Sequence, residues 1–292
     1  MRAIEFHAPS SINEALPLLD DNARIIAGGT DIIPQLNAGV WSIDKVVDIK
    51  TVAEANVLEF SKEKGLSLGA AVPCHLIYND KRVVEHYQGL IDSASMIGGI
   101  QIQGRASIGG NLCNAVPSAD SIPALIALGA ICVIAGHDGS RRVPVEEFCI
   151  GPRKSVLGTD ELLVSLDIPC PKPNSGGRYI RFIPRNEMDI AVAGVGVQVV
   201  LSDSRDTIVS ARIALSAVGP TPLLVDTAGA ALEGVDVSES SIDKAALLAK
   251  DAATPISDMR GTVEHRKQLV YVLTKRALRD AIKRAKGESL DV

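Results

Sequence analysis

The chain has 292 residues, of which 46% are hydrophobic and 22% are charged, a composition that is typical of folded globular proteins and excludes an intrinsically disordered chain. Its 30 lysines and arginines face 35 aspartates and glutamates, and the resulting net charge of −5 gives no general attraction to nucleic acid or anionic membranes. Because the sequence has no run of about 18 apolar residues and no secretory leader, we expect a cytoplasmic protein without membrane insertion.

The first 50 residues have the pattern of an α/β unit. Ser11 and Glu14 form a capping-box pattern, which predicts an amphipathic helix through about Leu19. Short apolar runs predict three strands, at 3–6, 23–27 and 46–49. A glycine turn lies at the junction between the second strand and the segment that follows it.

The middle of the chain alternates predicted helices and strands, which indicates a mixed α+β region. Helices are expected at about 74–98 and 120–129, and strands at 66–71, 131–135 and 162–168. The segment 170–177 is rich in Pro, Gly and Ser, which favour irregular chain, so we predict a domain boundary there.

Beyond that boundary, the pattern predicts a smaller domain of strands followed by helices. Two long apolar runs, at 189–201 and 207–219, flank a polar turn and predict an antiparallel hairpin with one buried face. Two helices follow, at about 241–253 and 262–286. The predicted domains are therefore 1–172, with lobes at about 1–55 and 56–172, and 173–292.

The five cysteines, at positions 74, 113, 132, 149 and 170, are too widely spaced to form the paired ligands of zinc or iron–sulfur sites. The histidines show no HExxH pair on which hydrolytic metal chemistry depends. We therefore expect no metal in this chain. Cys113 stands alone beside an apolar run, which favours a packed side chain without a catalytic role.

The first segment with a chemical signal is a pair of glycines that follows a predicted strand. Adjacent glycines can adopt positive φ and turn successive N–H groups toward one anion, so a phosphate or pyrophosphate would fit. The same glycines are also compatible with a simple tight turn, because the segment matches neither GxGxxG nor GxxxxGK[ST]. The candidate residues are Ile26, Ala27, Gly28, Gly29, Thr30 and Asp31.

A second glycine pair repeats this arrangement with a hydroxyl before it and an amide after it. These two polar side chains are able to complete a ring of donors around phosphate oxygens. Two such loops would together hold one diphosphate, although each alone again permits a tight turn. The candidate residues are Ser107, Ile108, Gly109, Gly110 and Asn111.

The segments around both glycine pairs, 27–39 and 98–130, closely resemble the flavin-binding subunit of the xanthine dehydrogenase and carbon monoxide dehydrogenase family of molybdenum hydroxylases. Three further segments, 178–191, 219–234 and 256–278, resemble that subunit's C-terminal domain. The resemblance implies an α+β fold: a two-lobed FAD-binding domain of the PCMH, or vanillyl-alcohol oxidase-like, type, followed by a smaller domain with a three-stranded antiparallel sheet and flanking helices.

Carried over to this sequence, the resemblance implies that the two glycine loops hold the FAD pyrophosphate through their backbone. It also assigns three other residues to the cofactor site. Asp120 matches an acidic residue that helps to hold the cofactor, although an Asp there is equally suited to cap the following helix, and we expect it to do both. Leu163 matches an apolar residue near the flavin, where a core role is the simpler interpretation. Arg181 replaces the lysine that is common in relatives.

The resemblance further implies partners. A large subunit carries the molybdenum cofactor and a small subunit carries iron–sulfur clusters, in a complex expected to be a dimer of heterotrimers. One branch of the family inserts a cysteine-bearing segment that binds an extra cluster, but this chain runs from Asn111 to Asp120 without an insertion, so that cluster is not expected. Lys275, Arg279 and Lys283 share a predicted helix face that is typical of a solvated surface and also suits docking.

The implied function is electron transfer through noncovalently bound FAD to a terminal acceptor. We expect no catalytic acid, base or nucleophile in this chain, because substrate hydroxylation would take place in the large subunit. Two alternatives remain open at this point. One is a self-sufficient flavin oxidase or reductase of the same fold superfamily, which would need acid–base residues over the flavin. The other is a nucleotide-binding scaffold without a redox role, which the glycine loops alone would permit.

Overall fold

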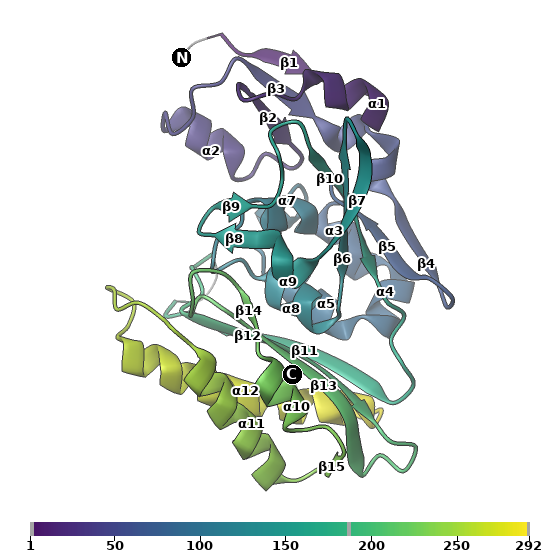
Figure 1. The fold of residues 1–292 in the computed structure, drawn as a ribbon, viewed down its shortest axis with the longest axis vertical. Coiled ribbons are helices and arrows are strands. Elements are labelled where there is room, and N and C mark those ends of the chain that lie inside the picture. The colour runs from purple at the N-terminus through teal and green to yellow at the C-terminus, as the bar shows by residue number, and fades with distance from the viewer. Residues whose placement is uncertain (1–2, 186–187, 291–292) are drawn as a thin grey trace.

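The computed structural model describes residues 3–185 and 188–290; within the resembling segment 178–191, positions 186 and 187 lie outside the described residues. Figure 1 shows two lobes that lie above a third sheet, which two long helices cover from below. The mixed α+β fold, with a two-lobed domain and a smaller domain built on an antiparallel sheet, confirms the predicted fold class.

The first lobe contains a three-stranded parallel sheet in the order β1-β3-β2. Ser11 caps the first helix as predicted, but the Glu14 carboxylate accepts hydrogen bonds from Ser10 and not from Ser11, so the capping box is incomplete. After one turn the helix tightens into a 3₁₀ segment at Leu16–Leu18. The elements of this lobe are β1 (Glu5–His7), α1 (Ile12–Ala15), β2 (Ala23–Ile26), α2 (Ile32–Asn37) and β3 (Lys45–Asp48).

The second lobe contains a five-stranded antiparallel sheet in the order β4-β5-β10-β6-β7. Its helices pack against this sheet around a large apolar core. The strands are β4 (Leu58–Ser61), β5 (Gly65–Gly69), β6 (Ile131–Gly136), β7 (Gly139–Pro144) and β10 (Leu162–Ile168), and the short hairpin β8 (Cys149–Gly151) and β9 (Lys154–Ser155) lies beside them. The helices are α6 (Ile100–Gln103), α7 (Ile108–Cys113), α8 (Ser121–Ala127) and α9 (Val145–Phe148).

The region predicted to be helical at about 74–98 is helical, but its helix is interrupted. The structure divides this region into α3 (Cys74–Asn79), α4 (Lys81–His86) and α5 (Gln88–Ala94). Asp80 adopts an extended backbone conformation, and its carboxylate accepts hydrogen bonds from the amides of Arg82 and Val83. An aspartate that caps a new helix ends the previous one.

The C-terminal sheet is built from three long antiparallel strands, β11 (Ser175–Phe182), β12 (Ala193–Leu201) and β13 (Thr207–Ser216). The predicted hairpin is confirmed as β12 and β13, but the prediction of one buried face is wrong for β12. A Cβ built on Gly196 would lie 2.5 Å from backbone atoms of Pro123 in α8, while α12 contacts the strand as well. With helices on both faces, the strand is apolar along nearly its whole length.

Two short strands and three helices complete this part of the chain. The strands extend the sheet at β13, and the two long helices cover the sheet on the side away from the lobes (Figure 1). These elements are β14 (Leu223–Leu224), β15 (Val235–Asp236), α10 (Asp226–Ala230), α11 (Glu239–Ala252) and α12 (Val263–Ala285).

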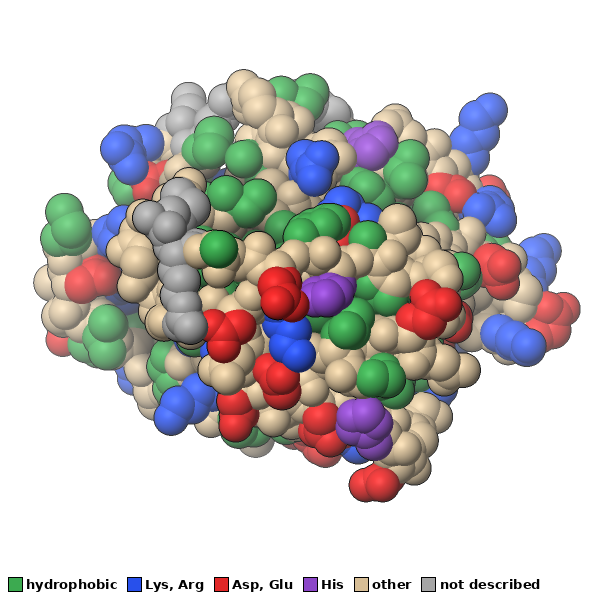
Figure 2. All heavy atoms as spheres, turned by 90° about the horizontal axis from the view of Figure 1, so that it is seen from above, with side chains coloured by type: hydrophobic (Ala, Val, Ile, Leu, Met, Phe, Trp, Pro, Cys, Tyr) green, Lys and Arg blue, Asp and Glu red, His purple; other side chains and the backbone are tan. Residues whose placement is uncertain are grey.

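The surface of the first lobe carries charges of both signs. Figure 2, which views the molecule from this end, shows basic, acidic and apolar side chains interspersed. No helix in the described ranges, 3–185 and 188–290, is long and apolar enough to cross a membrane.

Candidate functional site

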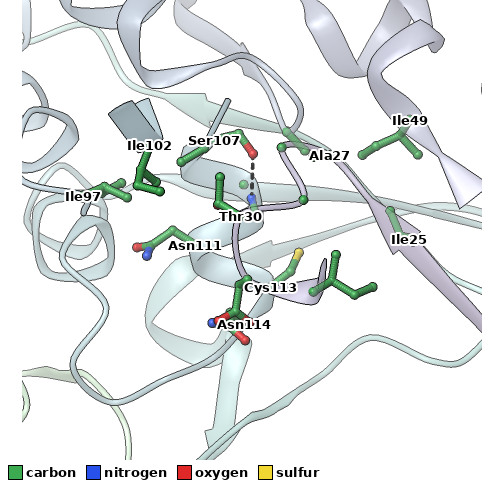
Figure 3. Close-up of a pocket in the computed structure, with 18 of the residues that line it drawn as sticks. Ile25, Ala27, Thr30, Ile49, Ile97, Ile102, Ser107, Asn111, Cys113 and Asn114 are labelled. Atoms are coloured by element: carbon green, nitrogen blue, oxygen red, sulfur yellow. Dashed lines mark hydrogen bonds between the residues drawn. The ribbon is translucent and has the colours of Figure 1, made fainter. Parts of the chain in front are cut away.

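A pocket of about 480 Å³ opens between the two lobes, within the size range of ligand pockets. Both glycine segments line it, although some 75 residues separate them in the sequence (Figure 3). The predicted site residues that line this pocket are Ala27, Gly28, Gly29, Thr30, Asp31, Ser107, Gly109, Gly110, Asn111 and Leu163.

The first glycine loop follows β2 and leads into α2. Gly29 has a φ of 77°, a conformation that favours glycine. Gly28 meets a different constraint, because a Cβ built on it would lie 2.0 Å from the carbonyl oxygen of Arg105, next to the second loop. The two loops therefore pack directly against each other at Gly28, and any larger residue there would separate them.

The second glycine loop forms the first turn of α7. The Ser107 hydroxyl accepts a hydrogen bond from the amide of Gly110 at 3.0 Å, which caps the helix. A Cβ built on Gly109 would lie 2.4 Å from the carbonyl oxygen of Ala70, whereas one built on Gly110 would meet only the Ser107 hydroxyl, at 3.0 Å. Gly109 thus permits packing on the second lobe, and Gly110 keeps the pocket open.

Polar side chains of both loops meet in the pocket, where Thr30 lies beside Ser107 and Asn111 (Figure 3). The Asn111 side-chain oxygen accepts hydrogen bonds from the backbone amide and the hydroxyl of Ser121, at 3.2 and 2.6 Å. Its side-chain amide nitrogen has no acceptor among the described residues. Asn111 therefore ties the second loop to the start of α8.

Asp120 occupies the capping position of α8, but its side chain makes no capping hydrogen bond, so the predicted capping role is wrong. Its carboxylate instead accepts hydrogen bonds from the Tyr179 hydroxyl at 2.7 Å and the Arg181 guanidinium at 2.6 Å. Burial raises the pKa of the Asp120 carboxyl, and the neighbouring Arg181 opposes that rise. Burial and the adjacent carboxylate also raise the pKa of Tyr179 well above its ordinary value, so the hydroxyl stays protonated and donates.

Four predicted residues lie outside the pocket lining. Ile26 packs with Ile43 and Val46 in the first lobe, and Ile108 belongs to the core of the second lobe. Asp120 and Arg181 form their buried pair where β11 meets α8, and Asp120 directly precedes Ser121, the hydrogen-bond partner of Asn111. Their contact with the pocket is therefore indirect, through the elements that they join.

The structure adds a polar wall to the pocket that sequence reasoning missed. Trp41 donates from its indole nitrogen to the Gln35 side chain at 2.8 Å, and Gln35 in turn donates to the Asp31 carboxylate. The Arg24 guanidinium lies 4.4 Å from the centre of the Trp41 ring. Trp41 lies in a stretch without strong periodicity, so no sequence pattern identified it. The one signal in the sequence was that it is the chain's only tryptophan.

The remaining lining is mostly apolar and comes from distant parts of the chain. Its residues include Ile25, Ile49, Ile97, Ile102, Leu157 and Met188. Cys113 also lines the pocket and is exposed, unlike the packed side chain expected from the sequence. Among the described lining residues, the ionisable side chains are Arg24, Asp31 and Cys113.

This arrangement suits an elongated ligand with a charged middle and an apolar, planar part. Backbone N–H groups of two loops are available for phosphate oxygens, and the aliphatic side chains offer a surface for a ring system. Within residues 3–185 and 188–290, no group of three or more His, Cys, Asp or Glu side chains is placed to hold a metal.

Comparison with known proteins gives matches over nearly the whole chain. The model of the FAD binding domain in molybdopterin dehydrogenase matches residues 2–171, and that of the CO dehydrogenase flavoprotein C-terminal domain matches residues 178–281. The chain is 31% identical to the carbon monoxide dehydrogenase medium chain of Afipia carboxidovorans, over 98% of this chain and 99% of that one. It is 29% identical to the xanthine dehydrogenase FAD-binding subunit of Escherichia coli O157:H7, over 97% of each.

Solved structures give the same result for the fold. The structure is similar to a chain of carbon monoxide dehydrogenase from Hydrogenophaga pseudoflava, with a TM-score of 0.92 and 28% identity, over 97% of this chain and 98% of that one. A chain of quinoline 2-oxidoreductase from Pseudomonas putida 86 gives a TM-score of 0.89 at 29% identity, with coverage of 97% and 98%.

Proposed function

Because the chain belongs to the family of FAD-binding subunits of molybdopterin dehydrogenases, we propose that it is the electron-transfer flavoprotein subunit of a molybdenum hydroxylase complex. It is an oxidoreductase subunit whose cofactor is FAD. The observation that carries this function is the convergence of two glycine loops on one pocket, each with backbone N–H groups available for a diphosphate.

FAD supplies chemistry that no side chain of this protein offers, since a flavin accepts electrons one at a time and releases them in pairs. The chain's own residues bind and orient it. In our proposal Gly28–Asp31 and Ser107–Asn111 hold the diphosphate, and Leu163 with the aliphatic lining shields the ring. Asp120 and Arg181, which do not line the pocket, support it from behind by fixing β11 against α8.

The space and the side chains of the site are consistent with FAD binding. Gly110 leaves space where a side chain would block a phosphate, and Gly28 allows the two loops to approach each other. The lining carries few acid–base groups, which does not favour a self-sufficient flavin oxidase or reductase with its own substrate pocket.

We further propose the partners and the domain division. A large subunit with the molybdenum cofactor oxidises the organic substrate, an iron–sulfur subunit transfers the electrons, and this chain delivers them to a terminal acceptor, in a dimer of heterotrimers. Similarity to a protein named as the medium chain of carbon monoxide dehydrogenase supports a multi-subunit setting. The flavoprotein comprises an FAD-binding domain at 1–172 and a C-terminal domain at 173–292.

Two measurements test this function. The purified chain should show a flavin absorption spectrum, and acid precipitation should release the flavin into the supernatant as FAD, because binding is noncovalent. Cys113 supplies the thiol of the pocket lining, and a thiol is a group to which a flavin can be attached covalently. Because we propose noncovalent binding, Cys113→Ser should retain FAD. Colour that stays with the precipitate would refute noncovalent binding.

Affinity purification with the neighbouring gene products should yield molybdenum and iron in the complex, and their absence would contradict the proposed partners.

A further inference from the structure

Three consecutive carbonyl groups of the first glycine loop each accept a hydrogen bond from a donor outside the loop. Two of these donors are the cationic side chains of Lys50 and Arg105, which come from distant parts of the sequence, and the third is a backbone amide of α2. The pairs are Lys50 Nζ with the Ala27 oxygen at 3.0 Å, Arg105 Nε with the Gly28 oxygen at 3.2 Å, and the Ile33 amide with the Gly29 oxygen at 3.1 Å.

These bonds determine where the amides of the loop point. In a trans peptide the C=O and N–H groups point in opposite directions, and the described chain contains no cis peptide bond. A carbonyl held away from the pocket therefore turns the following N–H toward it. Gly28, Gly29 and Thr30 carry these N–H groups, and none of the three has an acceptor among the described residues. Successive amides of this kind form an anion-binding concavity.

Lys50 reaches the loop from the end of β3. Its ammonium group also contacts the Asp48 carboxylate at 2.6 Å, and that carboxylate accepts from the Lys50 backbone amide at 3.0 Å. Asp48 is 7% exposed, so it holds the Lys50 side chain in place from a buried position. The ammonium is thus fixed between one carboxylate and the Ala27 carbonyl.

Arg105 reaches the loop from the segment that leads into the second glycine loop, two residues before Ser107. Its backbone carbonyl packs on Gly28 and its guanidinium donates to the Gly28 oxygen, so one residue joins the two glycine loops. Both cations lie behind the loop, on the side opposite to the turned amides. Their positive charges also favour a diphosphate in front of the loop.

We propose that Lys50 and Arg105 are positioning residues that orient the amides of Gly28, Gly29 and Thr30 toward the diphosphate of the cofactor. They act through the loop carbonyls and not by contact with the cofactor. This inference rests on the proposed FAD function and adds to it the residues that create the loop's donor geometry.

The test measures FAD and ADP affinity of the full chain after removal and reconstitution of the flavin. Lys50→Met and Arg105→Met remove the donors and keep the aliphatic stems, and Lys50→Arg and Arg105→Lys restore a cationic donor. Lys45→Met is the matched control, because Lys45 pairs with Asp20 at 2.8 Å in the same lobe without contact to the loop. Thermal unfolding of each flavin-free variant reports on the fold independently of binding.

Each methionine variant should lose about tenfold in affinity for both FAD and ADP, the factor that corresponds to the weaker of the hydrogen bonds made by charged groups. The conservative variants should recover most of that loss, and Lys45→Met should bind as the wild type does. Folded methionine variants with wild-type affinity would overturn the proposal, and so would a Lys50→Arg variant that binds as weakly as Lys50→Met. If Lys50→Met does not fold, the FAD and ADP affinity of Arg105→Met decides whether the proposal holds. A wild type that binds neither ligand would refute the FAD function itself.

Discussion

Arg181 and Asp120 form a buried ion pair that joins β11 to the start of α8. The guanidinium lies 2.6 Å from one carboxylate oxygen, and the two side chains are 8% and 10% exposed. Tyr179 donates to the other oxygen, so both oxygens of the carboxylate have a partner. This pair connects the C-terminal domain to the helix that Asn111 caps at the pocket.

The pair predicts a defined pH dependence. Because burial raises the native pKa of Asp120, the native state binds this proton more tightly than the unfolded chain does. Its contribution to stability is full below the unfolded pKa of about 3.9 and is lost as the pH rises through the native value. Relative to Asp120→Asn, the wild type should therefore gain stability as the pH falls from 7 toward 4. Urea unfolding at a series of pH values checks this, and a pH-independent difference would contradict it.

Gly110 is the position where a side chain should affect the cofactor and spare the fold. Gly110→Val places methyl groups in the pocket in front of α7, and we expect FAD affinity to fall at least tenfold, roughly the effect of one lost hydrogen bond or more. The matched control is Gly104→Val, since a Cβ built on Gly104 meets nothing within 4 Å. Equilibrium binding with a thermal melt distinguishes the two effects; a folded Gly110→Val protein with unchanged affinity would count against the site.

Gly109 should give the opposite result from Gly110. Its Cβ would lie 2.4 Å from the Ala70 carbonyl oxygen, so Gly109→Ala forces α7 away from the second lobe. We expect the free energy of unfolding to fall by about 1–3 kcal/mol, as for other overpacked positions. Denaturant unfolding of the flavin-free protein measures this loss, and an unchanged midpoint would show that the loop is not packed as described.

Trp41 provides an optical signal for the pocket, because it is the chain's only tryptophan and lines the site. A nucleotide held at both glycine loops lies next to this wall, so ADP, which does not absorb in the range of indole emission, should change the Trp41 fluorescence. Prior saturation with FAD should prevent the change. Emission that is insensitive to saturating ADP would place the nucleotide elsewhere.

Asp92 connects the two domains through its carboxylate. It accepts hydrogen bonds from Arg178, from the Tyr179 amide and from both terminal nitrogens of Arg284, and it is 10% exposed on the side chain. Asp92→Ala leaves two part-buried guanidinium groups without this partner and should cost about 3–5 kcal/mol. Asp20→Ala, which removes an exposed carboxylate from its pair with Lys45, should cost much less in the same urea titration. Equal losses of stability in the two variants would refute the role of Asp92 in connecting the two domains.

Local patterns were sufficient to predict much of the fold. The strand β10 and the hairpin of β12 and β13 follow from apolar runs bounded by turn residues, and the glycine loops follow from paired glycines after a strand. The strand β7 was missed because four of its six residues are exposed, so its sequence lacks an apolar signal. The break at Asp80 was missed because a capping aspartate inside a helical pattern resembles an ordinary polar position.

The site was predictable where its chemistry is local and not where it depends on tertiary contacts. Both glycine loops were identified from adjacent residues, with help from family resemblance. Lys50 and Arg105 belong to no sequence motif. Only the folded chain places Lys50 beside the Ala27 carbonyl and Arg105 beside the Gly28 carbonyl. Asp120 likewise fitted a local capping role, but its partners are more than 50 residues away, and pairing with a buried cation outweighs one capping bond.

We propose that electrons reach this chain's FAD from a partner subunit and not from an organic substrate bound here. The most direct test follows flavin bleaching after anaerobic mixing of substrate with the FAD-loaded chain alone, with the complete complex, and with the complex without its iron–sulfur subunit. We expect rapid bleaching only in the complete complex, with FAD still bound in all three preparations. Rapid bleaching of the isolated chain by an organic substrate would contradict it and identify a self-sufficient flavoenzyme.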